Sequence, residues 1–255
     1  MINCLENNLS TSSTSNITCL EIIGDIPILC HLLETVKNTS MIKNVYVLLK
    51  DCQKEQVQME MKRWSIGIEK PIYYIGIGYS VISPIFLANI MENDIFYTDL
   101  SFPFLSFSVF EWFSKKIKKE YINILIGNFK LEHFINTQKL YTIPQFFENI
   151  PLLSVDVNDI RFMNFAFIPF SLKETFNILK QETVISFILH QKDLKSHLLP
   201  KFFMHYEALP CLDQSDIQFL THKYQKHNQS NSSMEFYYLW KKLEKLENKL
   251  PQVES

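Results

Sequence analysis

GDIPILCHLLETVKNTSMIKNVYVLL, the stretch from Gly24 to Leu49, decides the fold of this chain of 255 residues. Pro27 follows a Gly-Asp turn and favours the first turn of a helix, and apolar residues then recur at helical spacing as far as Val36. Asn44 to Leu49 is an apolar, β-branched run of the kind found in buried parallel strands. A helix followed by such a strand predicts an α/β protein.

Helices and strands continue to alternate beyond this stretch. Apolar periodicity predicts three further pairs of a helix and a strand, at residues 55–64, 72–77, 84–91, 94–98, 106–119 and 122–126. In the second half we expect helical stretches at 172–181 and 191–199, and a helix that begins at Ser215. The predicted fold class is α/β, with a three-layer, Rossmann-like and mostly parallel sheet that has helices on both faces.

The carboxyl-terminal part of the chain differs from the rest. Residues 1–227 are expected to form one α/β domain, and the polar residues 228–233 a linker. Within residues 234–255, apolar side chains recur at alternating intervals and make a two-heptad seam of Phe236, Leu239, Leu243, Leu246 and Leu250. The seam predicts a C-terminal amphipathic helix that docks on its own domain, or that joins a second copy or another protein.

The composition excludes several classes of protein. Only 5 of the residues are Gly, and the sequence contains neither a Walker A loop nor a dinucleotide fingerprint. The formal net charge of −2 gives no electrostatic reason to expect a nucleic acid partner. Residues 71–91 carry no charge, but their Tyr, Ser, Asn, Pro and Gly residues make them a poor membrane span, so no membrane partner is expected.

The expected location follows from the cysteines and from the first residues. The 5 Cys include no CxxC pair, and their odd number does not fit a fully paired disulfide framework. Residues 1–15 are polar and lack the basic and apolar regions of a secretory signal. We therefore expect a cytoplasmic protein in a reducing compartment, with Cys19 and Cys30 as small core residues.

Asp99 is the first candidate for chemistry. It follows the strand predicted at 94–98, and in open α/β sheets ligands bind outside the carboxyl ends of the strands. A carboxylate at that place can hold Mg²⁺ against phosphate oxygens. As an alternative, Asp99 caps the turn that follows, which is a common role of Asp.

The remaining polar residues are less specific candidates for a functional site. Asp213 and Asp216 lie near the start of a predicted helix, where Asp216 alternatively only compensates the helix dipole. The 7 His residues include no HxH or HxxxH pair. His31 is expected on the polar, solvated side of the first helix.

Three motifs follow one another in the chain: Gly24 to Leu29 with the strand that ends at Leu49, then DLSFPFLS from Asp99 to Ser106, and LDQSDI from Leu212 to Ile217. In this order they resemble motifs of the nucleotidyltransferases of the GT-A-like fold, which include MobA-like enzymes and cytidylyltransferases. The matching motifs there are a Gly-x-Pro-Leu-Ile helix with a Val-Tyr-Val strand, Asp-x-x-x-Pro-Phe-Leu-Ser, and Asp-x-Asp-x-x-Glu-Asp-Leu. The resemblance extends over residues 15–225 and implies the nucleotide-diphospho-sugar transferase fold.

The resemblance also implies roles for single residues. Asp99 and Asp213 match the two aspartates that bind the divalent metal in that family, so both are implied to be catalytic and to hold Mg²⁺. Ser83 matches a serine near the base and the ribose, and Gly78 lies in the same stretch. Both are therefore implied to bind the nucleotide.

The amino-terminal segment departs from the family pattern. The family has a Gly-rich loop with Arg or Lys there, but no Gly, Lys or Arg precedes Ile23 in this chain. Close backbone approach to phosphate needs Gly, and developing charge on pyrophosphate needs cations. The hydroxyls of Ser12, Ser13 and Ser15 are the expected nucleotide-binding substitutes, so Mg²⁺ would supply most of the compensating charge. Cys211 replaces the first Asp of the late motif.

The sequence and the resemblance together predict a divergent nucleotidyltransferase. It would transfer a nucleoside monophosphate from an NTP to a phosphorylated small molecule, with Mg²⁺ and with release of pyrophosphate. The missing loop motivates a second hypothesis, an inactive homologue that acts as a nucleotide-binding or protein-binding regulatory subunit. A third hypothesis is an unrelated α/β protein with the same alternation of elements.

Overall fold

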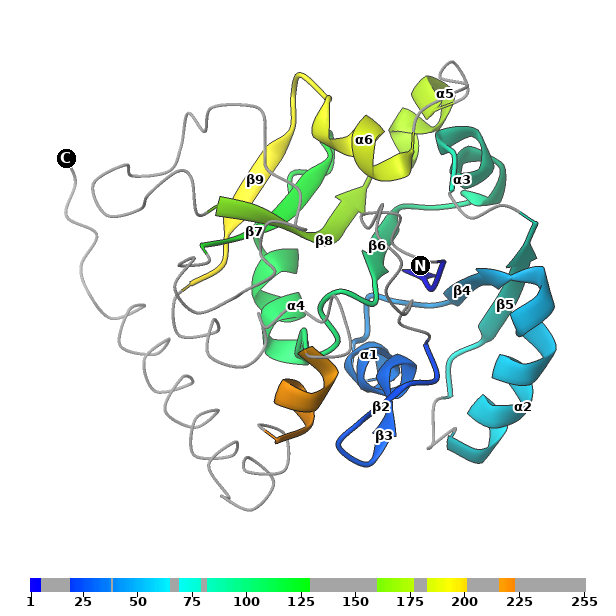
Figure 1. Cartoon of the computed structure of the whole chain (residues 1–255). Coiled ribbons are helices and arrows are strands. Elements are labelled where there is room, and N and C mark those ends of the chain that lie inside the picture. The colour runs from blue at the N-terminus through cyan, green and yellow to red at the C-terminus, as the bar shows by residue number, and fades with distance from the viewer. Residues whose placement is uncertain are drawn as a thin grey trace.

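A sheet of seven strands lies at the centre of the described part of the chain (Figure 1). The computed structural model describes residues 1–5, 19–37, 39–64, 69–78, 82–128, 160–176, 183–200 and 216–222. The strands of this sheet are β1 (Ile2–Asn3), β4 (Val45–Lys50), β5 (Ile72–Ile77), β6 (Ile95–Asp99), β7 (Asn123–Asn128), β8 (Ile160–Ile168) and β9 (Lys195–Leu198). They lie in the order β5-β4-β1-β6-β8-β7-β9.

The sheet is mostly parallel, as the sequence predicts. The pairs β4·β5, β1·β4, β1·β6 and β7·β9 are parallel, whereas β8 is antiparallel to both of its neighbours, β6 and β7. The carboxyl ends of all the parallel strands therefore lie at one edge of the sheet, and β8 runs in the opposite direction between β6 and β7. The short strand β1 lies at the centre and pairs with both β4 and β6.

Helices cover both faces of the sheet and make the predicted three layers (Figure 1). One face carries α1 (Ile28–Lys37), α2 (Lys54–Trp64), α4 (Phe107–Ser114) and the helical residues 216–222. The other face carries α3 (Pro84–Ile90), α5 (Lys173–Phe176) and α6 (Val184–Leu189). None of these helices in the described part of the chain has the length and the apolar character that crossing a membrane requires.

Alternation along the strands divides the apolar side chains between the two layers of helices. In β4, Val47 and Leu49 belong to the cluster with α1 and α2, whereas Leu48 between them belongs to the cluster with α3 and α6. This is the period of two that a strand buried on both faces requires. A small antiparallel hairpin of β2 (Ile22–Ile23) and β3 (Ile26–Pro27) leads into α1, and its turn uses Gly24 at a φ of 68°.

Three strands of the sheet were not predicted from the sequence. Residues 191–199, expected to be helical, contain β9, so that prediction is wrong. β8 occupies an aromatic segment without any expected element, and β1 is only two residues long. The expected linker at 228–233 and the C-terminal helix at 234–255 lie outside the described residues.

β8 contains a bulge where it passes the end of β6. Ile124 of β7 pairs with Ala166, but Ile126 pairs with Phe162, so three residues of β8 lie opposite one residue of β7. Asn164, the middle residue of the three, has a φ of 49°, a left-handed conformation that Asn adopts more readily than most residues. Bulges redirect side chains out of the regular alternation, and this one directs Asn164 toward Asp99, as described next.

Candidate functional site

The parallel strands β5, β4, β1 and β6 end side by side, at what we call the carboxyl edge. Gly78 follows β5, Asp51 follows β4, Cys4 follows β1, and Asp99 is the last residue of β6. With a strand spacing of about 4.8 Å, the ends of β5 and β6 are roughly 14 Å apart, because β4 and β1 lie between them. A ligand that contacts both Gly78 and Asp99 must therefore lie across β4 and β1.

The Asp99 carboxylate is buried and held by hydrogen bonds at both oxygens. Its side chain is only 1% exposed. The backbone N–H of Ser101 donates to Oδ1 at 2.8 Å, and Asn164 Nδ2 donates to Oδ2 at 2.8 Å. Asn164 Nδ2 also lies 3.3 Å from Ser101 Oγ. Asp99 thus has the turn-capping contact that the sequence offered as the alternative, together with a second contact from Asn164 that the sequence did not reveal.

The burial of Asp99 makes its negative charge unfavourable. Burial raises the pKa of Asp99 from 3.8 to about 6, although the hydrogen bonds from Ser101 and Asn164 act in the opposite direction. A carboxyl whose charged form is destabilised at the end of a strand is typical of functional sites as well as of structural networks.

The oxygen atoms of Asp99 and Asn164 are of the kind that binds a divalent cation. Mg²⁺ prefers hard oxygen ligands, and next to the Asp99 carboxylate the buried Oδ1 of Asn164 has no hydrogen-bond partner in the described residues. A cation at this place would favour the charged form of Asp99 that burial disfavours. The described residues contain no group of three or more His, Cys, Asp or Glu that could hold a metal, and Asp213 lies outside them.

The two glycines at the end of β5 differ in how closely they approach Asp51. A Cβ atom added to Gly76 would overlap Asp51 Oδ1 and would lie 3.2 Å from Asp51 Cα, whereas a Cβ atom on Gly78 would lie 3.5 Å from Asp51 Oδ2, an ordinary contact. Gly76 is therefore required by packing. Gly78 is not, which leaves it as an open stretch of backbone at the carboxyl edge.

Ser83 has a structural role of its own. It is the N-cap of α3, and its Oγ accepts a hydrogen bond from the backbone N–H of Phe86 at 3.2 Å. Such a cap satisfies one of the free N–H groups at the start of a helix. The helix start that the sequence predicts here is confirmed, and the implied contact between Ser83 and a nucleotide stays a prediction.

The buried thiol of Cys4 interacts electrostatically with Asp99 and with a second buried thiol, that of Cys19. Burial and a hydrogen bond with Cys19 raise the pKa of Cys4, whereas the hydrogen bond with Cys4 lowers the pKa of Cys19. Both residues are almost fully buried, as expected for Cys19 from the sequence. The carboxyl edge thus combines a carboxylate, an amide and a thiol pair.

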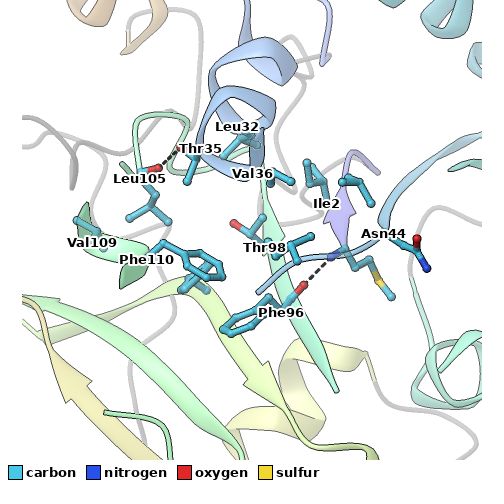
Figure 2. Close-up of a pocket in the computed structure, with 14 residues that line it drawn as sticks. Ile2, Leu32, Thr35, Val36, Asn44, Phe96, Thr98, Leu105, Val109 and Phe110 are labelled. Carbon is cyan, nitrogen blue, oxygen red and sulfur yellow. Dashed lines mark hydrogen bonds between the residues drawn. The ribbon is translucent and has the colours of Figure 1, made fainter. Parts of the chain in front are cut away.

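The structure also contains an apolar pocket, shown in Figure 2, between α1, α4 and the sheet. Leu32 and Val36 of α1 face Val109 and Phe110 of α4 across it, with Phe96 of β6 beneath them. Its fourteen lining residues, all of them described, include no charged side chain. The pocket is mostly apolar, although Met1, whose α-amino group donates to the Phe96 carbonyl oxygen, also lines it. None of the predicted site residues lines this pocket.

The predicted site residues differ in how far the structure tests them. Asp99, Gly78 and Ser83 lie near the carboxyl edge, at the ends of β6 and β5 and at the start of α3. The other predicted site residues, Asp213, Ser12, Ser13 and Ser15, lie outside the described residues.

Sequence reasoning missed Asn164 and misplaced His31. The one signal for Asn164 was a lone Asn within the apolar run from Phe162 to Ile168. His31 is buried, at 8% exposure, with Nε2 3.0 Å from the Ile23 carbonyl oxygen and its ring edge-on to Phe104, so the solvated position expected for it is wrong.

No protein-family model matches the chain, and no curated protein matches it either. Solved structures do match. HddC from Yersinia pseudotuberculosis has a TM-score of 0.61 at 10% identity, over 88% of this chain and 97% of that one. A 4-diphosphocytidyl-2C-methyl-D-erythritol synthase from Anaerococcus prevotii has a TM-score of 0.57 at 12% identity, over 88% and 94%.

A third match is CMP:2-keto-3-deoxy-manno-octonic acid synthetase complexed with CTP, which has a TM-score of 0.58 at 9% identity, over 89% of this chain and 97% of that one. At these identities the likeness concerns the fold alone. Together with the mostly parallel sheet and its one antiparallel strand among the described residues, it shows that this chain has the nucleotide-diphospho-sugar transferase type of fold, the fold of these three solved structures.

Proposed function

We propose that the chain is a divergent nucleotidyltransferase that uses Mg²⁺ to transfer a nucleoside monophosphate from an NTP to a phosphorylated small molecule. The observation that carries the proposal is Asp99, a buried carboxylate at the end of β6 that is held from both sides at the carboxyl edge. Its support is the fold, which this chain shares with a synthetase whose structure was solved in complex with CTP.

Each residue has a part in the proposed reaction. Asp99 and Asp213 would hold Mg²⁺, which supplies positive charge to the phosphates and to the pyrophosphate leaving group. Ser101 and Asn164 keep the Asp99 carboxylate in one orientation. A phosphate oxygen of the acceptor then attacks the α-phosphorus in line, and the bond to pyrophosphate breaks, a reaction that depends mainly on positioning and charge.

The nucleotide would lie across the ends of β4 and β1 on this proposal. Gly78 presents backbone without a side chain at one end of that span, and Asp99 lies at the other. Ser12, Ser13 and Ser15 would donate hydrogen bonds to the phosphates in place of the missing Gly-rich loop.

Calorimetry with each NTP in the presence of Mg²⁺ tests the proposal, followed by a pyrophosphate-release assay with phosphorylated acceptors. We expect one NTP to bind below millimolar concentration and binding to fall when EDTA removes Mg²⁺. No binding of any NTP at millimolar concentration would contradict the proposal.

Three variants locate the site. Asp99→Asn should weaken Mg²⁺-dependent binding by more than about tenfold. Asp94→Asn is the matched control, because Asp94 precedes the same strand at its amino end, where it accepts a hydrogen bond from the Phe170 N–H. Gly78→Ala should weaken nucleotide binding without loss of stability, because its Cβ meets only an ordinary contact. Equal affinity in Asp99→Asn and Asp94→Asn would show that the metal site lies elsewhere.

The second candidate is a protein of the same fold without catalysis, which binds nucleotide or another protein as a regulatory subunit. The absence of Gly, Lys and Arg before Ile23 favours it, because the triphosphate then lacks the usual cations. Nucleotide binding without release of pyrophosphate for any acceptor would favour this candidate. A cytoplasmic location stays part of the proposal in either case.

A further inference from the structure

Three thiols lie in one buried cluster beneath the carboxyl edge, and the proposed function uses none of them. Cys4 is 5% exposed, Cys19 is 3% exposed and Cys30 is 5% exposed, and all three pack in the cluster that includes α1. All three are free thiols. Cys52 lies in the short helical turn Asp51–Gln53. It is exposed and serves below as a reference thiol.

Backbone hydrogen bonds anchor Cys4 and Cys19 to two different elements that pack in the same cluster. Cys4 directly follows β1, and its N–H donates to the Leu48 carbonyl oxygen at 2.9 Å, so it is anchored in the centre of the sheet. The Cys19 carbonyl oxygen accepts from the Leu29 N–H at 3.1 Å, which anchors it against the start of α1. Between these anchors the two thiols hydrogen-bond to each other, whereas the interaction of Cys30 with Cys19 is electrostatic.

We propose that Cys4 and Cys19 are a redox pair, which a peroxide converts into a reversible disulfide bond. One thiolate attacks hydrogen peroxide and becomes a sulfenic acid, with loss of the first water, and the other thiol displaces the sulfenic oxygen as a second water. Two thiols and one hydrogen peroxide thus give one disulfide and two waters. A small oxidant suits this pair, since both sulfur atoms are shielded from larger reagents by burial.

The disulfide would connect the end of β1 to the residue that anchors the start of α1. It would close a loop over residues 4–19, which removes conformational freedom from the unfolded chain. The proposal is independent of the proposed function, since it concerns only the two thiols and the backbone that holds them.

The sequence allows a direct assignment of the bond. Glu6, Glu21 and Glu34 divide the first part of the chain so that a glutamate-specific protease releases residues 1–6, 7–21 and 22–34, each with one cysteine. The full-length protein is reduced, treated with hydrogen peroxide, unfolded in urea, alkylated and digested, and the peptides are analysed by mass spectrometry. We expect residues 1–6 and 7–21 to appear as one linked species, lighter than their sum by two hydrogen atoms and separated again by dithiothreitol.

Two other results would overturn the proposal. One is a link between residues 7–21 and 22–34, which would join Cys19 to Cys30. The other is full recovery of alkylated Cys4 and Cys19 under conditions that oxidise the exposed Cys52.

Thermal unfolding gives a second measurement. The oxidised protein should melt roughly 5–10 °C higher than the reduced protein, and Cys30→Ser should show the same rise. Cys4→Ser and Cys19→Ser, given the same peroxide, should show none. A rise that persists in Cys4→Ser would contradict the assignment, and the linked peptides of the unsubstituted protein decide the question if a variant does not fold.

Discussion

Asp99 is at once almost fully buried and ionisable, and its environment sets the sign of its effect on stability. Its pKa in the folded chain, about 6, lies above its ordinary value of 3.8 because burial penalises the charge. The folded state therefore binds the proton more tightly than the unfolded state does. The cost of the charged carboxylate is absent below about pH 4 and complete above about pH 6.

In the presence of EDTA, the effect of Asp99→Asn on stability should therefore be more favourable at neutral pH than at pH 4. Relative to its own effect at pH 4, the substitution should raise the free energy of unfolding by about 3 kcal/mol at pH 7.5, the equivalent of the pKa shift. Urea unfolding of both proteins across this pH range measures the difference. A difference that does not change with pH would show that the carboxylate is not strained by burial.

His197 titrates with the opposite sign in the same pH range and must be separated from Asp99. Burial, together with Lys116 and Lys118, lowers the pKa of His197 to about 4, so its contribution to stability is lost as the pH falls. Because His197 is present in both proteins, subtracting one unfolding curve from the other removes its contribution.

Asn164 contributes through its backbone and through its side chain, and two substitutions separate these contributions. Asn164→Gly keeps the left-handed backbone and loses the hydrogen bonds to Asp99 and Ser101. Asn164→Ala loses the same bonds and adds the strain of a Cβ at a φ of 49°, about 1 kcal/mol more. By urea unfolding, the free energy of unfolding should be highest for the unsubstituted protein, lower for Asn164→Gly and lowest for Asn164→Ala. Equal values for the two variants would show that the backbone relaxes.

The sequence predicts single residues well only where their role is local. Asp99 could be found because it directly follows a predictable strand. Asn164 could not, because its partner Asp99 is far away in the chain and the bulge that joins them depends on how β8 pairs with β6 and β7. The burial of His31 in α1 could not be predicted either, because Phe104, whose ring contacts it, belongs to the loop that follows β6.

At the scale of elements, Gly76 fixes how the ends of β4 and β5 fit together. Gly76→Ala should lower the free energy of unfolding by roughly 1–3 kcal/mol, because its Cβ would overlap Asp51 Oδ1. Gly78→Ala is the matched control and should change stability by much less. In an Asp51→Ala background the cost at Gly76 should shrink, and a double-mutant cycle by urea unfolding measures this coupling. If the effects of Gly76→Ala and Asp51→Ala on the free energy of unfolding simply add, the contact between the new Cβ and Asp51 is contradicted.

Helices and strands whose apolar residues recur at a regular interval could be predicted from the sequence. The strands near 45, 72, 95 and 123 and helices α1, α2 and α3 carry apolar residues at the right spacing, and the structure places them within two residues of the expected bounds. β9 reads Lys-Ser-His-Leu and has no apolar alternation, so only its pairing with β7 makes it a strand. In β8 the bulge at Asn164 interrupts the alternation that would have identified it.

At the scale of the whole molecule, the seam of apolar residues from Phe236 to Leu250 gives a prediction for the oligomeric state. We expect a monomer, because two heptads are short for a coiled coil and suit a helix that docks on its own domain. Light scattering of the full chain and of residues 1–233 tests this expectation. A dimer that becomes a monomer on truncation would favour the alternative of pairing through the seam.

The two-residue strand β1 has a consequence for how the chain folds. Ile2 pairs with Val47 on one side and with Thr98 on the other, so the centre of the sheet is made of contacts between residues distant in sequence. Such contacts form slowly because a long loop must close first. On the ribosome, β1 emerges before β4 and β6 and has to wait for residue 98 before both its partners exist. The β4·β5 half can pair earlier, which makes the docking of residues 2–3 the event that joins the two halves of the molecule.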